Sequence, residues 1–376
     1  MVIKNLRIVL SNKIIEKGYL VFDNGVFTDI KEGECPLEAL DGKGLTAMPG
    51  FIDVHVHGSS GIDFMDAKED DYEVIANSLY KEGVTTFLAT TLTSDHESLL
   101  RVCRTVKNIK DYIPSLGGIH FEGPYISTKY KGAQNEKFIR LPDIKEFDEL
   151  QKASGNNVKY ITLAVEKDGA LEFIKHVTKQ NVVASVGHSD ASFNDVKKAI
   201  EMGLSNVTHT HNAMSPHHHR HPGVVTSAFY FDELFTEFIC DKIHVCPEVL
   251  LTSYKIIGPD RFVMITDALK VKNSNINEFQ LFGLDCVKKD GAAYLTSGPL
   301  AGSILTMDQG LRNMKEITGA SLIDLAKISS GNAAKSLHLS DRGELAVNKL
   351  ADFVLLDESL RVLATYKLGK KVYEND

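Results

Sequence analysis

Histidine and acidic residues recur in short motifs through the middle of the chain, and each motif follows an apolar run. The first motif is Asp53-Val54-His55-Val56-His57, in which two imidazoles stand two residues apart. The others are His120-Phe121-Glu122-Gly123-Pro124, Gly187-His188-Ser189, Thr208-His209 and Thr266-Asp267-Ala268. Alternate side chains of a strand share a face, so we expect the two imidazoles of the first motif to point the same way.

Nitrogen and oxygen donors without thiolates suit zinc, iron, manganese or cobalt. A divalent ion lowers the pKa of a bound water to about 7 and polarises a carbonyl group. One such motif alone is weak evidence, because isolated histidines are often structural. The joint pattern predicts a site for one or two divalent ions with six candidate ligands: His55, His57, Glu122, His188, His209 and Asp267.

The elements that would position these residues form a regular series. Short apolar runs rich in β-branched residues alternate with helical segments, and they lie near 51–57, 84–91, 117–122, 158–165, 181–187, 205–209, 236–240 and 261–266. Eight strand–helix units over about 220 residues fit a (β/α)8 barrel, in which reactive groups stand at the carboxyl ends of strands. A doubly wound sheet is the competing fold, but it would favour a glycine-rich phosphate turn after the first strand, and the sequence has none there.

Capping signals mark several of the expected helices. Ser94-Asp95-His96-Glu97 matches a capping box, and Asp168 and Ser192 each precede a helical pattern. After the eighth strand, the pattern predicts a hairpin at 281–297 and two helices, at about 306–316 and 321–335.

The two ends of the chain show short alternating apolar bursts separated by turn signals, which is typical of β-structure. We expect both ends to pair in one small β-sandwich domain made of residues 1–48 and 341–376. Residues 49–340 would then form the barrel.

The overall composition excludes several classes of protein. The 376 residues are 43% hydrophobic and 24% charged, which is ordinary for a globular chain. The net charge of −8 argues against a broad nucleic-acid-binding face, and no apolar run approaches the roughly 20 residues of a membrane span. Five cysteines without a CxxC pair predict free thiols, and the start of the chain lacks the features of a signal peptide, so we expect a cytoplasmic location.

Longer segments resemble the amidohydrolase superfamily and, more closely, its N-acetylglucosamine-6-phosphate deacetylase family. They are PGFIDVHVHG (49–58), GIHFEGPYIS (118–127), KGAQN (131–135), VGHSDA (186–191), THTHNAMSPHHHRHPG (208–223), CDKIHV (240–245), ITDAL (265–269), AGSILTM (301–307), SSGNAAKSLHL (329–339) and LADFVLLD (350–357). The HxEGP motif and the segment from His211 to Gly223 are specific to these sugar deacetylases, whereas the HxH motif marks only the superfamily.

The resemblance implies a role for each matched residue. Glu122, His188 and His209 would bind one divalent ion, and His55 and His57 would hold a second, with Glu122 bridging. Asp267 would be the general base and then the acid while metal-activated water attacks the acetamido carbonyl of a sugar phosphate, and no organic cofactor is implied. The implied substrate contacts are Ala133, Gln134, Asn212, Ala213, Arg220, His244 and Met307. Relatives are homodimers, so Arg220 could serve its own site or its neighbour's.

The sequence departs from the family pattern at three positions. Gln134 stands where a histidine is usual, and it can donate a hydrogen bond but cannot carry a proton. His211 replaces an aromatic residue and Lys242 replaces a glycine, and either change could reshape the sugar pocket. Lys242 could instead add positive charge near the phosphate.

Three alternatives stay open at this point. The substrate could be N-acetylgalactosamine 6-phosphate or another N-acyl amino-sugar phosphate, because a sequence does not separate epimers at one hydroxyl. A catalytically dead barrel would usually lack metal ligands, and here the set is complete. A cyclic-amide hydrolase or deaminase is disfavoured by Arg220 and by the absence of a bridging lysine, since Lys159 would lie at the wrong end of its strand.

Overall fold

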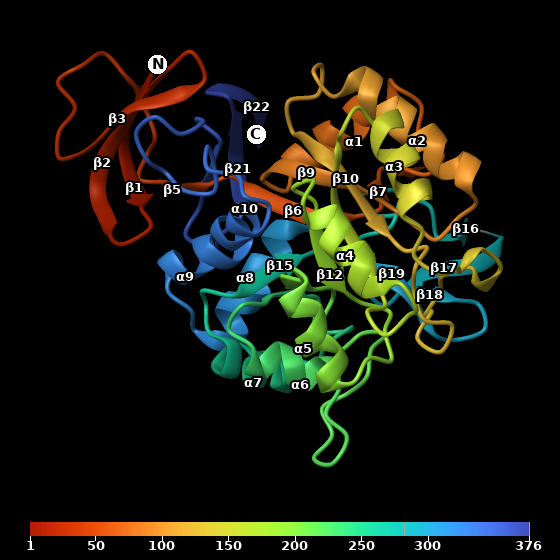
Figure 1. The fold of residues 1–376 in the computed structure, drawn as a ribbon. Helices are drawn as coiled ribbons and strands as arrows, with labels where there is room; N and C mark the ends of the chain where they lie inside the picture. Colours follow the sequence, from red (N-terminus) through yellow and green to blue (C-terminus); the bar gives the residue numbers. More distant parts are fainter. Residues whose placement is uncertain (282, 376) are drawn as a thin grey trace.

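The computed structural model describes residues 1–281 and 283–375, and it places the eight predicted runs side by side in one parallel sheet (Figure 1). The strands are β6 (Phe51–Val56), β9 (Val84–Thr91), β10 (Leu116–Glu122), β11 (Val158–Leu163), β12 (Val183–Val186), β13 (Asn206–Val207), β14 (Phe235–Ile239) and β15 (Phe262–Ile265). A parallel bridge between Val56 and Ala268 brings the first strand beside the segment that follows the last one. The predicted barrel is therefore confirmed.

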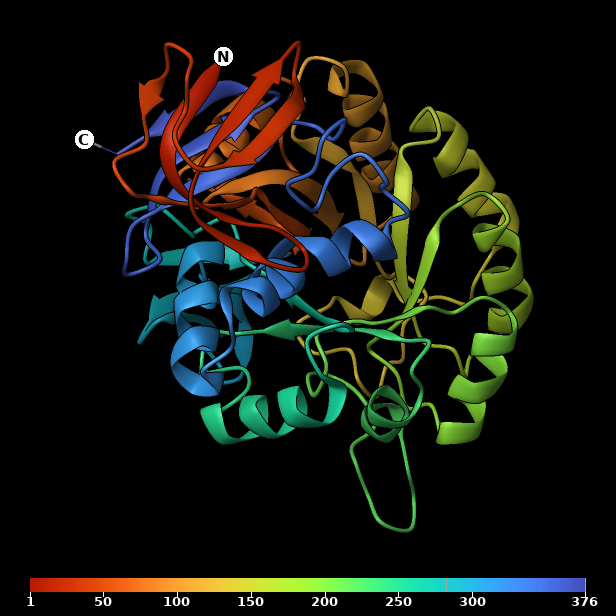
Figure 2. The same cartoon turned by 90° about the vertical axis from the view of Figure 1, so that its left-hand side faces the viewer.

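Helices follow the strands and wrap the outside of the barrel (Figure 2). They are α1 (Asp71–Tyr80), α2 (His96–Ile109), α3 (Ile144–Ala153), α4 (Ala170–Thr178), α5 (Phe193–Glu201), α6 (Val224–Tyr230), α7 (Pro247–Ile257) and α8 (Met307–Thr318). Helices cover the outer face of the sheet and side chains fill its interior, which is why every residue of β6, β9 and β14 except Phe235 is buried.

Of the three helix starts predicted from capping signals, that of α5 is confirmed, and those of α2 and α4 lie one residue later. Ser192 caps α5 in a full capping box with Asp195, as expected. The cap of α2 is Asp95, whose carboxylate accepts a hydrogen bond from the Ser98 amide at 2.9 Å, so this helix begins one residue later than the Ser94 motif suggested. Helix α4 is capped by Gly169, one residue later than Asp168 suggested. Gly169 has a φ of 82°, a left-handed conformation that glycine adopts more easily than other residues do.

Strands from both ends of the chain form a second sheet of eight strands. Its members are β1 (Val2–Val9), β2 (Ile14–Asp23), β3 (Val26–Glu32), β4 (Leu40–Asp41), β5 (Thr46–Pro49), β20 (Phe353–Leu356), β21 (Val362–Lys367) and β22 (Lys370–Glu374). The two ends meet where β5 pairs antiparallel with β20.

This sheet curls over its own core. The rings of Phe22 in β2 and Tyr366 in β21 lie 6.2 Å apart, although β1, β5 and β20 separate their strands in the sheet order. A flat sheet would hold these strands several times farther apart, at about 4.8 Å per step. The sheet thus closes over Phe22, Phe27 and Phe353 as the two faces of a small sandwich do. The division at residues 48/49 and 340/341 stays a prediction.

The region after β15 is more elaborate than the predicted hairpin. Residues 278–303 form a four-stranded antiparallel sheet of β16 (Glu278–Leu281), β17 (Leu284–Lys289), β18 (Ala292–Leu295) and β19 (Leu300–Ser303). The outer strands β16 and β19 are short and lack a clean apolar alternation, so only the central pair is visible in the sequence. The expected last helix consists of α9 (Leu322–Ala326), a π-helical turn (Lys327–Gly331) and α10 (Asn332–Ser336).

Small elements complete the part of the chain that the structure describes. They are β7 (Gly58–Ser59), β8 (Ile62–Asp63) and a 3₁₀ turn (Glu136–Phe138). The five cysteines are free thiols, as predicted. Among the described residues, every helix is too short or too polar to cross a lipid bilayer.

Candidate active site

The six candidate ligands gather at the carboxyl ends of the barrel strands. Glu122 is the last residue of β10, while His188, His209 and Asp267 each come two residues after their strands end. These three residues have positive φ angles of 48°, 29° and 48°. Such left-handed turns are uncommon for residues other than glycine, and they bend the chain sharply at the strand end, next to the point where the side chains converge.

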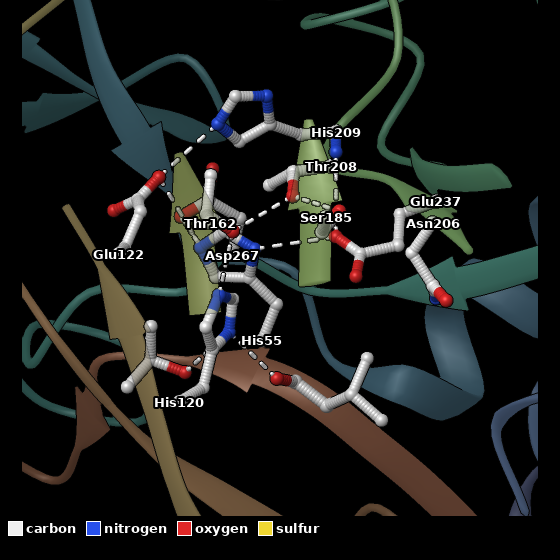
Figure 3. Close-up of polar contacts among 12 residues, drawn as sticks. His55, His120, Glu122, Thr162, Ser185, Asn206, Thr208, His209, Glu237 and Asp267 are labelled. Atoms are coloured by element: carbon white, nitrogen blue, oxygen red, sulfur yellow. Dashed lines mark hydrogen bonds and ion pairs between the residues drawn. The ribbon is translucent and has the colours of Figure 1, made fainter. Parts of the chain in front are cut away.

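Glu122, His188 and His209 form the first group, and their candidate ligand atoms lie within 4.8 Å of one another. Figure 3 shows two of them, Glu122 and His209. Glu122 Oε1 lies 3.0 Å from His188 Nε2 and 3.1 Å from His209 Nε2. The two Nε2 atoms are themselves only 3.1 Å apart. All three residues are at most 5% exposed.

His55, His57 and Asp267 form the second group, beside the first. His57 Nε2 lies 3.1 Å from Asp267 Oδ1 and 3.3 Å from Glu122 Oε2. His55 Nε2 lies 3.5 Å from both Asp267 Oδ1 and Glu122 Oε1. Glu122 therefore faces both groups, which is the position that a bridging carboxylate requires.

Burial and charge act against each other on these groups. Burial would lower the pKa of His57, but the Asp267 and Glu122 carboxylates outweigh it and raise that pKa to about 9. Burial would raise the pKa of Glu122, yet the charge of His55 and hydrogen bonds from His188 and His209 hold it well below its usual range. The pKa of Asp267 is lowered because His55 and His57 outweigh the effect of its burial. Both carboxylates are therefore ionised at neutral pH.

The donor set fits a divalent cation. His188 Nδ1 donates to the Tyr130 carbonyl at 2.8 Å, so Nε2 is the ring atom that remains to serve as a ligand. That nitrogen lies close to Glu122 Oε1 and His209 Nε2, and a cation between the three atoms would stabilise this arrangement. His55 Nε2 is also buried without a hydrogen-bond partner. Both groups thus carry buried atoms suited to metal coordination.

A cavity of about 170 Å³ opens directly above the two groups. It includes five of the predicted substrate contacts, Ala133, Gln134, Asn212, Ala213 and His244, together with His57, Glu122, His188, His209 and Asp267. Gln134 is held at both ends of its amide. Its Oε1 accepts from the Thr93 amide at 2.7 Å, and its Nε2 donates to Glu122 Oε2 at 2.7 Å.

Two predicted substrate contacts lie elsewhere. Met307 is fully buried in the main apolar core, so it does not line the cavity. Arg220 is exposed on the loop before α6, which projects away from the body of the barrel (Figures 1 and 2). It lines a separate surface hollow with Lys129 and Tyr130, and within one chain it does not reach the catalytic cavity.

The two departures at positions 211 and 242 also point away from the cavity. His211 Nε2 lies 2.9 Å from Ser253 Oγ, and burial lowers the pKa of this imidazole to about 4. Lys242 forms a surface ion pair with Glu316 at 2.7 Å. Neither side chain reshapes the cavity wall directly.

Sequence reasoning missed two contributors to the site. Leu281, Leu300, Ala301 and Gly302 form part of the cavity wall, and they belong to the four-stranded sheet that the sequence only partly revealed. Glu237 is fully buried and lies beside His55 and His209 (Figure 3). Its signal was present in the sequence, because a lone acidic residue interrupts the apolar strand Phe235–Ile239.

A parallel barrel with these candidate ligands at its mouth fits a metal-dependent hydrolase. The sequence profile of the amidohydrolase family matches residues 46–372. The N-acetylglucosamine-6-phosphate deacetylase of Bacillus subtilis strain 168 is 36% identical and covers 98% of this chain and 96% of its own length. The N-acetylgalactosamine-6-phosphate deacetylase of Escherichia coli O157:H7 is 33% identical, with 86% of each chain covered.

A solved structure shows the same likeness. A variant N-acetyl-D-glucosamine-6-phosphate deacetylase of Mycobacterium smegmatis, in complex with N-acetyl-D-glucosamine-6-phosphate, superposes with a TM-score of 0.94. It is 29% identical, and 99% of each chain is covered. The chain belongs to the amidohydrolase family and, within it, to the family of N-acetylglucosamine-6-phosphate deacetylases.

Proposed function

We propose that this chain hydrolyses the acetamide of N-acetyl-D-glucosamine 6-phosphate, releasing acetate and D-glucosamine 6-phosphate. The observation that carries the proposal is the convergence of four imidazoles and two carboxylates below one cavity. An inactive barrel would have no need for this buried set of ionisable side chains. The likeness to the B. subtilis deacetylase over 98% of the chain gives the substrate class.

One or two divalent ions would be held by these residues. Glu122, His188 and His209 would bind the first, and His55 and His57 the second, with Glu122 between them and Asp267 alongside. Zinc, iron, manganese and cobalt all match the nitrogen and oxygen donors. When bound, such an ion lowers the pKa of a water and polarises the acetamido carbonyl.

Asp267 would carry the protons of the reaction. Its side chain lines the cavity and is 14% exposed, so it can reach both the attacking water and the leaving nitrogen. Its lowered pKa leaves it ionised and ready to accept the water proton at a carboxylate oxygen. It would then deliver that proton to the amine nitrogen as the C–N bond breaks.

The sugar phosphate would be oriented by the rest of the cavity. Asn212 and Ala213 line the cavity, Gln134 has a second amide proton, and His244 stands at the cavity edge. The Asn212 backbone amide already donates to the His209 carbonyl at 3.0 Å, so the Ala213 amide is the backbone donor that we assign to the substrate. Arg220 lies outside the cavity of its own chain, so we assign it to the phosphate bound in a partner subunit of a homodimer. Free thiols fit a reducing, cytoplasmic environment.

The direct test is acetate release by the purified, metal-analysed enzyme from N-acetylglucosamine 6-phosphate. N-acetylgalactosamine 6-phosphate and unphosphorylated N-acetylglucosamine serve as matched substrates. We expect the highest kcat/KM on the first of the three. A higher value on the galactosamine epimer would transfer the assignment to that sugar, and no acetate from either phosphorylated sugar at full metal content would refute the proposal.

A further inference from the structure

Glu237 is a buried carboxylate beneath the two ligand groups. It occupies the middle of β14, and its side chain is completely inaccessible to solvent. Among the described residues, no lysine or arginine forms an ion pair with it. A carboxylate buried in this way is tolerated only where hydrogen-bond donors satisfy its oxygens.

The donors come from three different strands of the barrel or their ends, and Figure 3 shows two of them, His55 and His209, beside Glu237. The Tyr160 hydroxyl donates to Glu237 Oε1. Oε2 lies 3.4 Å from His55 Nδ1 and 3.3 Å from the backbone nitrogen of His209. Burial and the adjacent Glu237 charge raise the pKa of Tyr160 well above its usual value, so its hydroxyl stays protonated and donates.

These contacts determine which nitrogen of His55 carries the proton. A carboxylate only accepts, so the His55 nitrogen that faces it must be protonated. A bound ion would take the place of the second ring proton, so the ring that keeps its proton on Nδ1 would present its lone pair on Nε2. That atom points to the other side, 3.5 Å from Glu122 Oε1 and from Asp267 Oδ1, and it has no hydrogen-bond partner of its own.

Glu237 also contacts His209, which belongs to the other ligand group. His209 has a φ of 29°, and its amide is fixed by Glu237 Oε2 at the turn that directs the imidazole toward Glu122. Glu237 therefore touches one histidine from each group without lining the cavity.

We propose that Glu237 is a positioning residue of the metal centre, which fixes the Nδ1–H tautomer of His55 and anchors the His209 turn so that both Nε2 atoms face the ions. The inference rests on the proposed function only in taking His55 and His209 as metal ligands. Outer partners of this kind alter metal affinity by about 10- to 100-fold when they are removed.

The tautomer can be measured on the unmodified, zinc-loaded enzyme. Long-range ¹H–¹⁵N spectra report which ring nitrogen of each histidine is protonated, and a His55→Gln sample identifies the His55 signals by difference. We expect the proton on Nδ1 and none on Nε2. A proton on Nε2 of His55, with or without one on Nδ1, would overturn the proposal. This measurement does not depend on any Glu237 variant folding.

The second test is metal affinity measured by chelator competition. In Glu237→Gln the amide can donate to His55 Nδ1 and favour the wrong tautomer, so we expect a loss of about 10- to 100-fold, with a changed d–d spectrum of the cobalt-loaded protein. Thr162→Val is the matched control. It removes a buried hydroxyl that hydrogen-bonds to the side chains of His120 and Thr208, neither of which is a candidate ligand, and it should leave metal affinity unchanged.

The outcomes separate the two proposals. Unchanged metal affinity and an unchanged cobalt spectrum in folded Glu237→Gln would overturn the positioning role, even with full deacetylase activity in the wild type. Equal losses of metal affinity in Glu237→Gln and Thr162→Val would overturn it too, because they would show that any change to the buried polar residues of the barrel weakens metal binding. Failure of acetate release by an enzyme with normal metal content would instead refute the proposed substrate.

Discussion

The chain has two regions rich in histidine, and they differ in solvent exposure: one is buried in the barrel and the other lies on an exposed loop. His55, His57, His188 and His209 stand at strand ends and are 0%, 1%, 5% and 2% exposed. Residues 217–221 carry four further histidines on the projecting loop before α6, where all but the half-buried His218 are exposed. The rings of His218 and His219 stack on each other at 4.6 Å, with no carboxylate between them.

The comparison shows that the histidine count does not locate the site. In the barrel, each Nε2 atom is brought within 3.0 to 3.5 Å of a carboxylate oxygen by an element that is itself fixed in the core. On the loop, His218 Nδ1 accepts from the backbone amides of Arg220 and His221 and so shapes the turn. Imidazoles become candidate ligands where rigid strands aim them at shared carboxylates.

Glu122→Gln should have the largest effect, because this residue faces both ligand groups. We expect loss of most bound metal and a fall in turnover of at least about 10³-fold, the scale of several kcal/mol that metal polarisation supplies. Metal analysis and acetate release would measure both. His221→Asn on the exposed loop is the control and should retain full metal content and turnover. Normal metal binding by Glu122→Gln would contradict the shared-ligand assignment.

Asp267→Asn should lower turnover by at least about 10²-fold, the usual contribution of a general acid–base group. The amide still offers an oxygen to His57 but cannot accept the proton of water. We expect the fold and most of the metal to persist, checked by circular dichroism and metal analysis beside the rate. Near-normal turnover with metal intact would mean that another group is the base.

The barrel could be predicted because its signal is local and repeated. Each strand is a compact apolar run that stands out against its surroundings, and each catalytic motif follows one directly. The four-stranded sheet at 278–303 was half missed, because its outer strands are stabilised by pairing rather than by their own apolar pattern. The helix starts at Asp95 and Gly169 differ by one residue because neighbouring residues compete for the cap.

The site residues also differ in how far the sequence could predict their positions. Strand-end residues such as His188 could be placed from the sequence because β-strand ends converge in a barrel. Arg220 lies on a projecting loop, and no local pattern fixes where such a loop points. Met307 was expected to contact substrate because it ends a family motif, but it is the first residue of α8 and turns into the core. Glu237 depends on contacts with Tyr160 and His55, which are 77 and 182 residues away.

Arg220→Ala tests whether the arginine of the exposed loop binds the substrate phosphate. The chain is acidic, so a dianionic substrate needs a local positive site. We expect KM for the phosphorylated sugar to rise by roughly 10- to 150-fold, as a charge-assisted contact of about 1.5–3 kcal/mol implies. Activity on the unphosphorylated sugar should barely change, and equal losses on both sugars would show a structural role.

Mixed dimers decide which subunit Arg220 serves. Arg220→Ala and Asp267→Asn subunits are each impaired in a different half of the site. Activity recovered in the hybrid would place the arginine across the interface, because one of the two sites would then hold both an intact Asp267 and a partner's intact Arg220. No recovery beyond the sum of the parents would place it in its own subunit.

The smallest predicted effect concerns the His244–Asp241 pair and its contribution to stability. His244 belongs neither to the buried candidate ligands nor to the exposed loop histidines. It lines the cavity as the ligand histidines do, but its Nδ1 lies 2.6 Å from Asp241 Oδ2, away from the two ligand groups. Burial would lower its pKa, yet the hydrogen bond and charge of Asp241 outweigh it and raise the pKa above the usual value. The folded protein therefore favours a cationic His244, which suits contact with an anionic sugar phosphate.

The sign of the resulting pH dependence follows from the raised pKa. Below the unfolded value of about 6.5, His244 is protonated in both states and the pair with Asp241 stabilises the fold in full. As pH rises through the folded pKa, the proton is lost and that stabilisation disappears. The difference in unfolding free energy between wild type and Asp241→Asn, from urea titrations, should thus be larger at pH 6 than at pH 9. A difference that grew toward pH 9 would mean that His244 is held neutral and that the phosphate must find its cation elsewhere.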